Sequence, residues 1–206
     1  MTTWIAIALS AAFLLIAEAG PASATGGPRD AVASAVERFM TIVQNGRSDN
    51  AAVSADRQAQ IREIVREMFD FDEISRRALA RHWPTLQHDE QTEFVTLFRD
   101  LLERAYLAQV ETVGNEKIVF LGESSEGNGS AIVRSKVVTR QGSEIPLDYR
   151  MHLLDGRWRI YDVVVQGISF IASYRTQFDR VIRAESYRSL RERLQKQAAE
   201  NTAAQR

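Results

Sequence analysis

The stretch from Ser130 to Phe178, SAIVRSKVVTRQGSEIPLDYRMHLLDGRWRIYDVVVQGISFIASYRTQF, contains three strand patterns followed by the start of a helix. A period of two with one apolar face is typical of a half-buried antiparallel strand. Gln141-Gly142 and Asp155-Gly156 fall where hairpin turns are required, because glycine adopts positive φ without a Cβ clash. The alternation is clearest at Ile145, Leu147, Tyr149, Met151 and Leu153, and weaker versions cover 131–137 and 157–165.

Around this stretch the sequence predicts a fourth strand and several helices. Ile118–Leu121 is expected to form the first strand and Gly122–Gly129 a polar loop, which gives a four-stranded antiparallel meander. A sheet with one apolar face needs a helical cover, so the fold class is predicted to be α+β, with the meander packed against a set of helices. Helices are expected over about 30–46 (capped by Asp30), 56–69, 72–80 (capped by Asp72) and 88–114, from Ile168 onward, and over 187–197.

The 206 residues suit one domain preceded by an export signal. Trp4–Ala17 is almost wholly apolar and Pro21-Ala22-Ser23-Ala24 follows, a pattern that predicts a signal peptide cleaved after Ala24. An uncleaved membrane anchor is the alternative, although the apolar run is shorter than the ~20 residues of a spanning helix. We therefore predict a signal peptide over 1–24, a single α+β domain over 25–198 and a flexible tail over 199–206.

Composition excludes several classes of function. The formal net charge of -1 gives no electrostatic case for nucleic-acid binding, and the absence of cysteine excludes disulfides, thiolate zinc sites and cysteine nucleophiles. His82, His88 and His152 show no HxxxH or HExxH spacing, so no metal site is expected. No GxSxG, P-loop or GxGxxG motif occurs in the chain.

A few polar residues next to apolar segments have two interpretations each. Asp148 and Asp162 are either solvated or ion-paired sheet residues, or general bases whose pKa an apolar cavity raises. Arg175, next to Tyr174, either packs on a helix surface beside a carboxylate or contacts an anion. Periodicity identifies the apolar faces but does not distinguish a filled core from a cavity.

Several short phrases occur in a fixed order across about Ile61–Leu194. They are Phe69-Asp70-Phe71 with Ile74-Ser75, Ala78-Leu79-Ala80-Arg81-His82-Trp83, Gln91-x-x-Phe94-x-x-Leu97-Phe98-x-x-Leu101-Leu102, Leu147-Asp148-Tyr149-Arg150, Trp158-Arg159-Ile160-Tyr161-Asp162-Val163, Gly167-Ile168-Ser169 and Tyr174-Arg175-x-Gln177-Phe178. In this order and spacing they resemble the MlaC family of periplasmic phospholipid-binding proteins, also known as toluene-tolerance auxiliary proteins. Two positions depart from the family pattern: Ala80 stands where glycine is common, and Gln166 where an acid often precedes the glycine.

The resemblance implies a monomeric periplasmic lipid carrier rather than an enzyme, with phospholipid as cargo and no cofactor. Such carriers hold acyl chains in a cavity between sheet and helices, and exchange lipid with an inner-membrane ABC-transporter complex and an outer-membrane lipoprotein complex, which maintains outer-membrane lipid asymmetry. Arg175 is expected to contact the headgroup or a partner. The expected lipid-binding lining is Val133, Tyr149 and Met151 from the sheet and Phe94, Phe98, Leu101, Ile168 and Ile171 from the helices.

The sequence leaves three alternatives open. One is a carrier of hopanoids or other polyisoprenoids. Another is a small cavity enzyme, an isomerase or hydratase, with Asp148 or Asp162 as base near Tyr149. The third is an adaptor that binds only protein, with a filled core and an exposed apolar patch.

Overall fold

The computed structural model describes residues 26–45, 51–110 and 116–203. The predicted signal peptide, and its cleavage after Ala24, lie outside the described residues.

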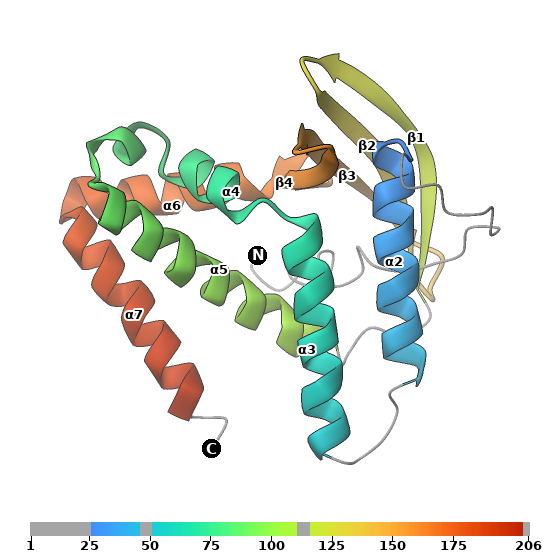
Figure 1. The fold of residues 1–206 in the computed structure, drawn as a ribbon, viewed down its shortest axis with the longest axis horizontal. Coiled ribbons are helices and arrows are strands. Elements are labelled where there is room, and N and C mark those ends of the chain that lie inside the picture. Colours follow the sequence, from blue (N-terminus) through green and yellow to red (C-terminus); the bar gives the residue numbers. More distant parts are fainter. Residues whose placement is uncertain (1–25, 46–50, 111–115, 204–206) are drawn as a thin grey trace.

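The sheet is an antiparallel meander with strand order β1-β2-β3-β4-β5 (Figure 1), which confirms the predicted fold class. In its centre, Tyr149 pairs with Val133 on one side and Val163 on the other. The fifth strand was not predicted and forms a two-residue edge beside Val164 and Val165. The strands are β1 Lys117–Gly127, β2 Ser130–Val138, β3 Glu144–Leu154, β4 Arg157–Val165 and β5 Ile168–Ser169.

The predicted loop over Gly122–Gly129 is wrong, because β1 continues to Gly127 and the turn is Asn128-Gly129. Register shifts after Phe120 and after Ser125 accommodate this polar segment, and Gly122 takes a φ of 145° at the first of them. In the described sheet β1 pairs only with β2, so its polar residues lie on an exposed edge strand. An edge strand tolerates a polar composition that resembles a loop.

The helices follow the predicted order, with shifted ends. Proline suits the first turn of a helix, and α2 begins at Pro28, ahead of the predicted cap Asp30. Asp70, not Asp72, caps α4, since its Oδ1 accepts a 2.9 Å hydrogen bond from the Glu73 N–H. The helical segments are α2 Pro28–Asn45, α3 Ala51–Met68, α4 Phe71–Leu79, the 3-10 helix η1 Ala80–Thr85, α5 His88–Val110, α6 Phe170–Ala184 and α7 Tyr187–Ala203.

The remaining helix ends also differ from the sequence-based expectation. The described part of α5 ends at Val110, and its predicted end near Val113-Gly114 falls outside the described residues. The helix after Gly167 begins at Phe170 rather than Ile168, because the Ser169 side chain accepts from the Ala172 N–H and caps it. α7 continues to Ala203, past the point where the sequence predicts a flexible tail.

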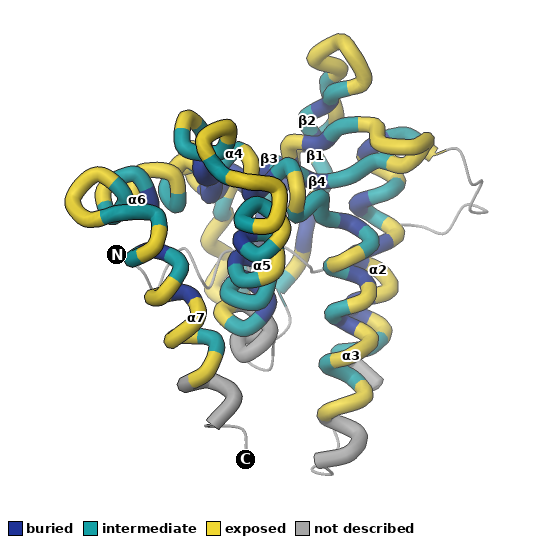
Figure 2. The backbone as a smooth tube through the Cα atoms, turned by 60° about the vertical axis from the view of Figure 1, so that its left-hand side comes forward, coloured by how far each residue is buried: buried dark blue, intermediate teal, exposed yellow. Residues whose placement is uncertain are grey.

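The chain builds two apolar clusters rather than one. α2 and α3 cover one face of the sheet and, with it, form the cluster that we call the sheet cluster, which includes Phe39, Ile64 and Met151. α4, α5, α6 and α7 pack together on the other side of the molecule (Figure 1) and form the helical cluster, which includes Phe94 and Leu190. In Figure 2 the buried positions of α2 and α3 lie apart from those of α5 and α7.

Candidate functional site

The predicted lipid-lining residues fall into two sets. Val133, Tyr149 and Met151 are fully buried in the sheet cluster, facing α2 and α3. Four others belong to the helical cluster: Phe94, Phe98 and Ile171 are buried in it, and Leu101 packs against it. Ile168 lies outside both clusters, on β5, where 53% of its surface is exposed.

Phe69, between α3 and α4, joins the two clusters, because its partly buried ring packs against both. It forms a parallel bridge with Ile160 of β4, and the next residue, Asp70, donates its N–H to the Ile160 carbonyl over 2.9 Å. We call this junction of Phe69, α4 and β4 the seam. The sequence shows Phe69 only as part of a motif, and its position between two apolar helix patterns is the one signal of this role.

Aromatic rings form the centre of the helical cluster. The Phe98 ring lies 5.0 Å from that of Tyr174 and 5.1 Å from that of Phe178, and Phe170 lies 4.8 Å from Tyr174. All three contacts are edge-to-face, the arrangement that the ring quadrupoles favour. Tyr174 directly precedes Arg175, so this aromatic stack positions the arginine that is expected to contact the headgroup or a partner.

Tyr149 places a hydroxyl inside the sheet cluster. Burial raises the pKa of this phenol well above its usual range, so the group stays neutral, and it hydrogen-bonds with the Ser135 side chain. The Ser135 hydroxyl donates in turn to the Leu147 carbonyl over 2.7 Å. The buried polar atoms are thus satisfied locally and leave the surrounding surface apolar.

The two acids considered as catalytic bases do not form a site with Tyr149. Asp162, only 4% exposed, accepts hydrogen bonds from Ser169, from the Ile171 N–H and from Arg150. Asp148 and Tyr149 are consecutive in β3 and therefore point to opposite faces of the sheet. Partial burial raises the pKa of Asp148, while Arg134 and Arg150 oppose this rise.

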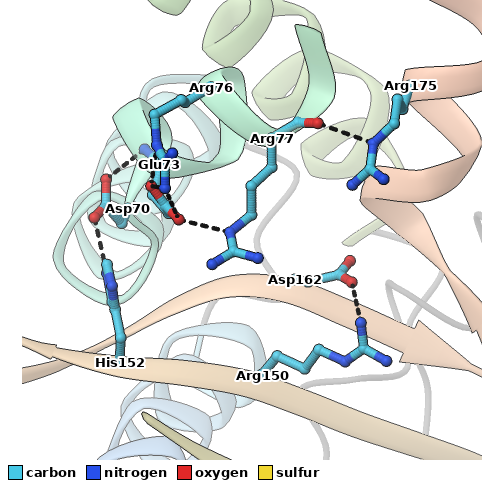
Figure 3. A network of polar contacts seen from close by, with 8 residues as sticks. All are labelled: Asp70, Glu73, Arg76, Arg77, Arg150, His152, Asp162 and Arg175. Atoms are coloured by element: carbon cyan, nitrogen blue, oxygen red, sulfur yellow. Dashed lines mark hydrogen bonds and ion pairs between the residues drawn. The ribbon is translucent and has the colours of Figure 1, made fainter. Parts of the chain in front are cut away.

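Arg175 lines an open pocket of about 660 Å³ between α4, η1 and α6, together with Arg76, Arg77, Ala80, Trp83 and Pro84. Arg76 donates two hydrogen bonds (2.7 and 2.6 Å) to the Glu73 carboxylate, and Arg77 donates a third (2.6 Å). The Arg175 Nε donates to the Arg77 carbonyl over 3.1 Å, as Figure 3 shows. Arg175 is predicted from the sequence as a site residue, whereas Arg76, Arg77 and Trp83 are not. Arg76 and Arg77 lie on α4, and Trp83 lies on η1.

A second set of polar contacts joins α4 to the sheet at the seam. The His152 Nε2 lies 2.9 Å from the Asp70 Oδ2 (Figure 3). The His152 ring also meets the Tyr161 ring edge-on at 5.5 Å, and the Arg77 guanidinium lies 4.0 Å over the centre of Tyr161. The pocket arginine Arg77 is therefore held from both sides, by Glu73 and by the sheet.

Within residues 26–45, 51–110 and 116–203, no group of three or more His, Cys, Asp or Glu side chains is placed to hold a metal ion. None of the helices in these ranges has the length and apolar character needed to cross a bilayer.

The fold and the site define an α+β protein with a divided apolar interior and an arginine-lined pocket beside it. The family model described as "MlaC protein" matches residues 33–196, and the chain belongs to this family.

Among solved structures, the chain is similar to the phospholipid-binding protein from Ralstonia solanacearum, solved in complex with a phospholipid. The TM-score is 0.71 at 21% sequence identity, and the match covers 85% of this chain and 98% of the other. This likeness shows a shared fold. No protein with a curated description matches the chain.

Proposed function

We propose that this chain is a periplasmic carrier that binds phospholipid in its apolar interior and does not act as an enzyme. The observation that carries the proposal is membership of the MlaC family over residues 33–196. The shared fold with a protein solved with phospholipid bound supports it. The phospholipid is cargo, and the carrier needs no cofactor.

The acyl chains enter at the seam, where the two apolar clusters adjoin at Phe69. In this proposal Val133, Tyr149 and Met151 contribute from the sheet cluster, and Phe94, Phe98, Leu101 and Ile171 from the helical cluster. Ile168, exposed on β5, contacts the part of the acyl chain that lies nearest the protein surface. Each CH₂ taken from water contributes about 0.8 kcal/mol, so an apolar interior can retain a chain without covalent chemistry.

The same proposal includes export and exchange. Residues 1–24 act as the signal peptide, and the mature chain shuttles lipid as a monomer between an inner-membrane ABC-transporter complex and an outer-membrane lipoprotein complex. Family membership is what supports these steps.

The test is native mass spectrometry of the chain, expressed with residues 1–24 in a Gram-negative host and purified from the periplasm without detergent. Organic extraction and lipid identification follow. We expect co-purified phospholipid at about one molecule per protein, and hopanoid in its place would redirect the proposal to another lipid class. A bare protein that also takes up nothing from phospholipid vesicles would refute the carrier function.

A further inference from the structure

The pocket lined by Arg76, Arg77 and Arg175 has more positive than negative charge. Glu73, whose side chain is 12% exposed, serves both Arg76 and Arg77. The Arg175 contact is to the Arg77 carbonyl, and Arg175 has no carboxylate partner among the described residues. Asp162 is engaged with Arg150, and Asp179 with Arg81 and His82. Asp72, in the first turn of α4, is exposed and is not part of the pocket lining.

The geometry of the pocket suits a phosphate group attached to an apolar body. A guanidinium group can donate two parallel hydrogen bonds to two oxygens of one phosphate, so it combines charge attraction with a defined geometry. Arg175 projects from α6 and Arg76 from α4, so the donors approach from two elements. The remaining lining is apolar, and one of its members, Trp83, packs against the helical cluster. The pocket therefore borders the apolar interior on one side and solvent on the other.

Resting on the proposed function, we infer that this pocket binds the phosphate of a lipid headgroup and favours headgroups with net negative charge. A single carboxylate, Glu73, does not neutralise the guanidinium groups of the pocket. An ammonium-bearing headgroup adds a positive charge that these groups repel, whereas a glycerol-bearing headgroup adds no positive charge. Free phosphate shares the anionic chemistry, so the source of the anion has to be distinguished by experiment.

The experiment exposes delipidated protein to vesicles of equal phosphatidylglycerol and phosphatidylethanolamine, re-isolates it and measures both lipids by mass spectrometry. Three variants are compared with the wild type: Arg175→Gln and Arg76→Gln in the pocket, and Arg180→Gln as control. Arg180 is an exposed arginine on α6 outside the pocket lining. A parallel arm titrates inorganic phosphate and follows the Arg175 Nε–H signal by NMR.

We expect about fivefold enrichment of phosphatidylglycerol in the wild type, the effect of one partly exposed charge interaction. Arg175→Gln and Arg76→Gln should lose most of this enrichment, and Arg180→Gln, outside the pocket lining, should keep it. Full lipid binding without enrichment, or enrichment that survives in both pocket variants, overturns the inference and leaves the carrier function intact. A protein that binds neither lipid refutes the carrier function, and an Arg175-dependent phosphate signal in that protein assigns the pocket to free phosphate.

Discussion

The Ser169 Oγ donates a 2.6 Å hydrogen bond to the Asp162 Oδ2 and accepts a 3.0 Å hydrogen bond from the Ala172 N–H. One hydroxyl therefore caps α6 and fixes its start to β4. The other oxygen of Asp162 accepts from the Ile171 N–H over 3.1 Å, so the carboxylate adds negative charge at the same helix end. This arrangement places Phe170, Tyr174 and Arg175 of α6 relative to the sheet.

Replacing Ser169 tests whether its hydroxyl fixes the start of α6 to β4. We expect Ser169→Ala to lower the free energy of unfolding by about 1–2 kcal/mol, since the helix loses its cap and a buried carboxylate loses a donor. Urea unfolding followed by circular dichroism measures the effect. Thr176→Ala is the matched control, because within the described ranges its hydroxyl bonds only to the Ala172 carbonyl, on the exposed side of α6. Equal effects in the two variants would contradict the role of Ser169.

Phe69 is predicted to make the two clusters unfold together. After removal of residues 1–24 the chain keeps two tryptophans, and Trp158 packs against the sheet cluster while Trp83 packs against the helical cluster. Variants with Trp83→Phe or Trp158→Phe thus report on one cluster each by fluorescence. With Phe69 present, the two urea transitions should coincide.

In Phe69→Ala we expect the two unfolding transitions to separate. The free energy of unfolding of the less stable cluster should fall by about 2–3 kcal/mol, because both clusters lose their packing against the Phe69 ring. Phe71→Ala is the control, because Phe71, whose ring lies 6.2 Å from that of Phe69, packs against the helical cluster but, among the described residues, not against the sheet cluster. Its transitions should remain coincident. If Phe69→Ala lowers both transitions together, the clusters are coupled through other contacts and the role assigned to Phe69 fails.

The sheet could be predicted from the sequence where one face of each strand is buried. The alternation around Tyr149 marks β3 clearly, and its register with Val133 follows from the β2–β3 hairpin. Its pairing with Val163 does not follow from the β3–β4 hairpin, because an irregularity between Arg150 and Met151 shifts the register by one residue. The end of β1 could not be predicted, because an edge strand over Gly122–Gly127 buries too little to require apolar residues. The cap of α4 was misplaced by two residues, since Asp70 and Asp72 are equally good caps by composition.

The candidate site was predictable only in part, because periodicity identifies an apolar face but not the face it meets. Tyr149 and Phe98 both appear as apolar-face residues, yet they belong to different clusters. Arg175 was identified from its motif, whereas its pocket depends on Arg76 and Arg77, which α4 brings to α6 from far away in sequence. The proximity of α4 and α6 depends on the tertiary structure, and no local sequence pattern predicts it.

Asp148 should make a contribution to stability that is lost as pH rises. Burial raises its pKa in the folded protein, so folding favours the protonated form. The contribution is present below the ordinary pKa of about 4 and disappears as pH rises through the folded-state value. We therefore expect Asp148→Asn to be at least as stable as the wild type at pH 7, with the urea midpoints converging at pH 3. A variant clearly less stable at pH 7 would show that the Arg134 and Arg150 charges outweigh burial.

Asp179 should show the opposite dependence, because hydrogen bonds from His82 and Arg81 lower its pKa. The His82 Nε2 lies 2.8 Å from the Asp179 Oδ1, which ties η1 to α6. Its contribution to stability is present above about pH 4, the ordinary value for the unfolded chain, and is lost as pH falls through the lower folded-state pKa.

We expect Asp179→Asn to lower the urea midpoint at pH 7 and to approach the wild type as pH falls below about 4. Glu192→Gln, an exposed α7 acid with no ion-pair partner in the described part of the chain, should leave the midpoint unchanged at both pH values. A pH-independent difference between Asp179→Asn and the wild type would mean that packing, rather than the charge of Asp179, holds η1 against α6. Because η1 carries Trp83 and Pro84 of the arginine-lined pocket, loss of this contact should also weaken the discrimination between headgroups.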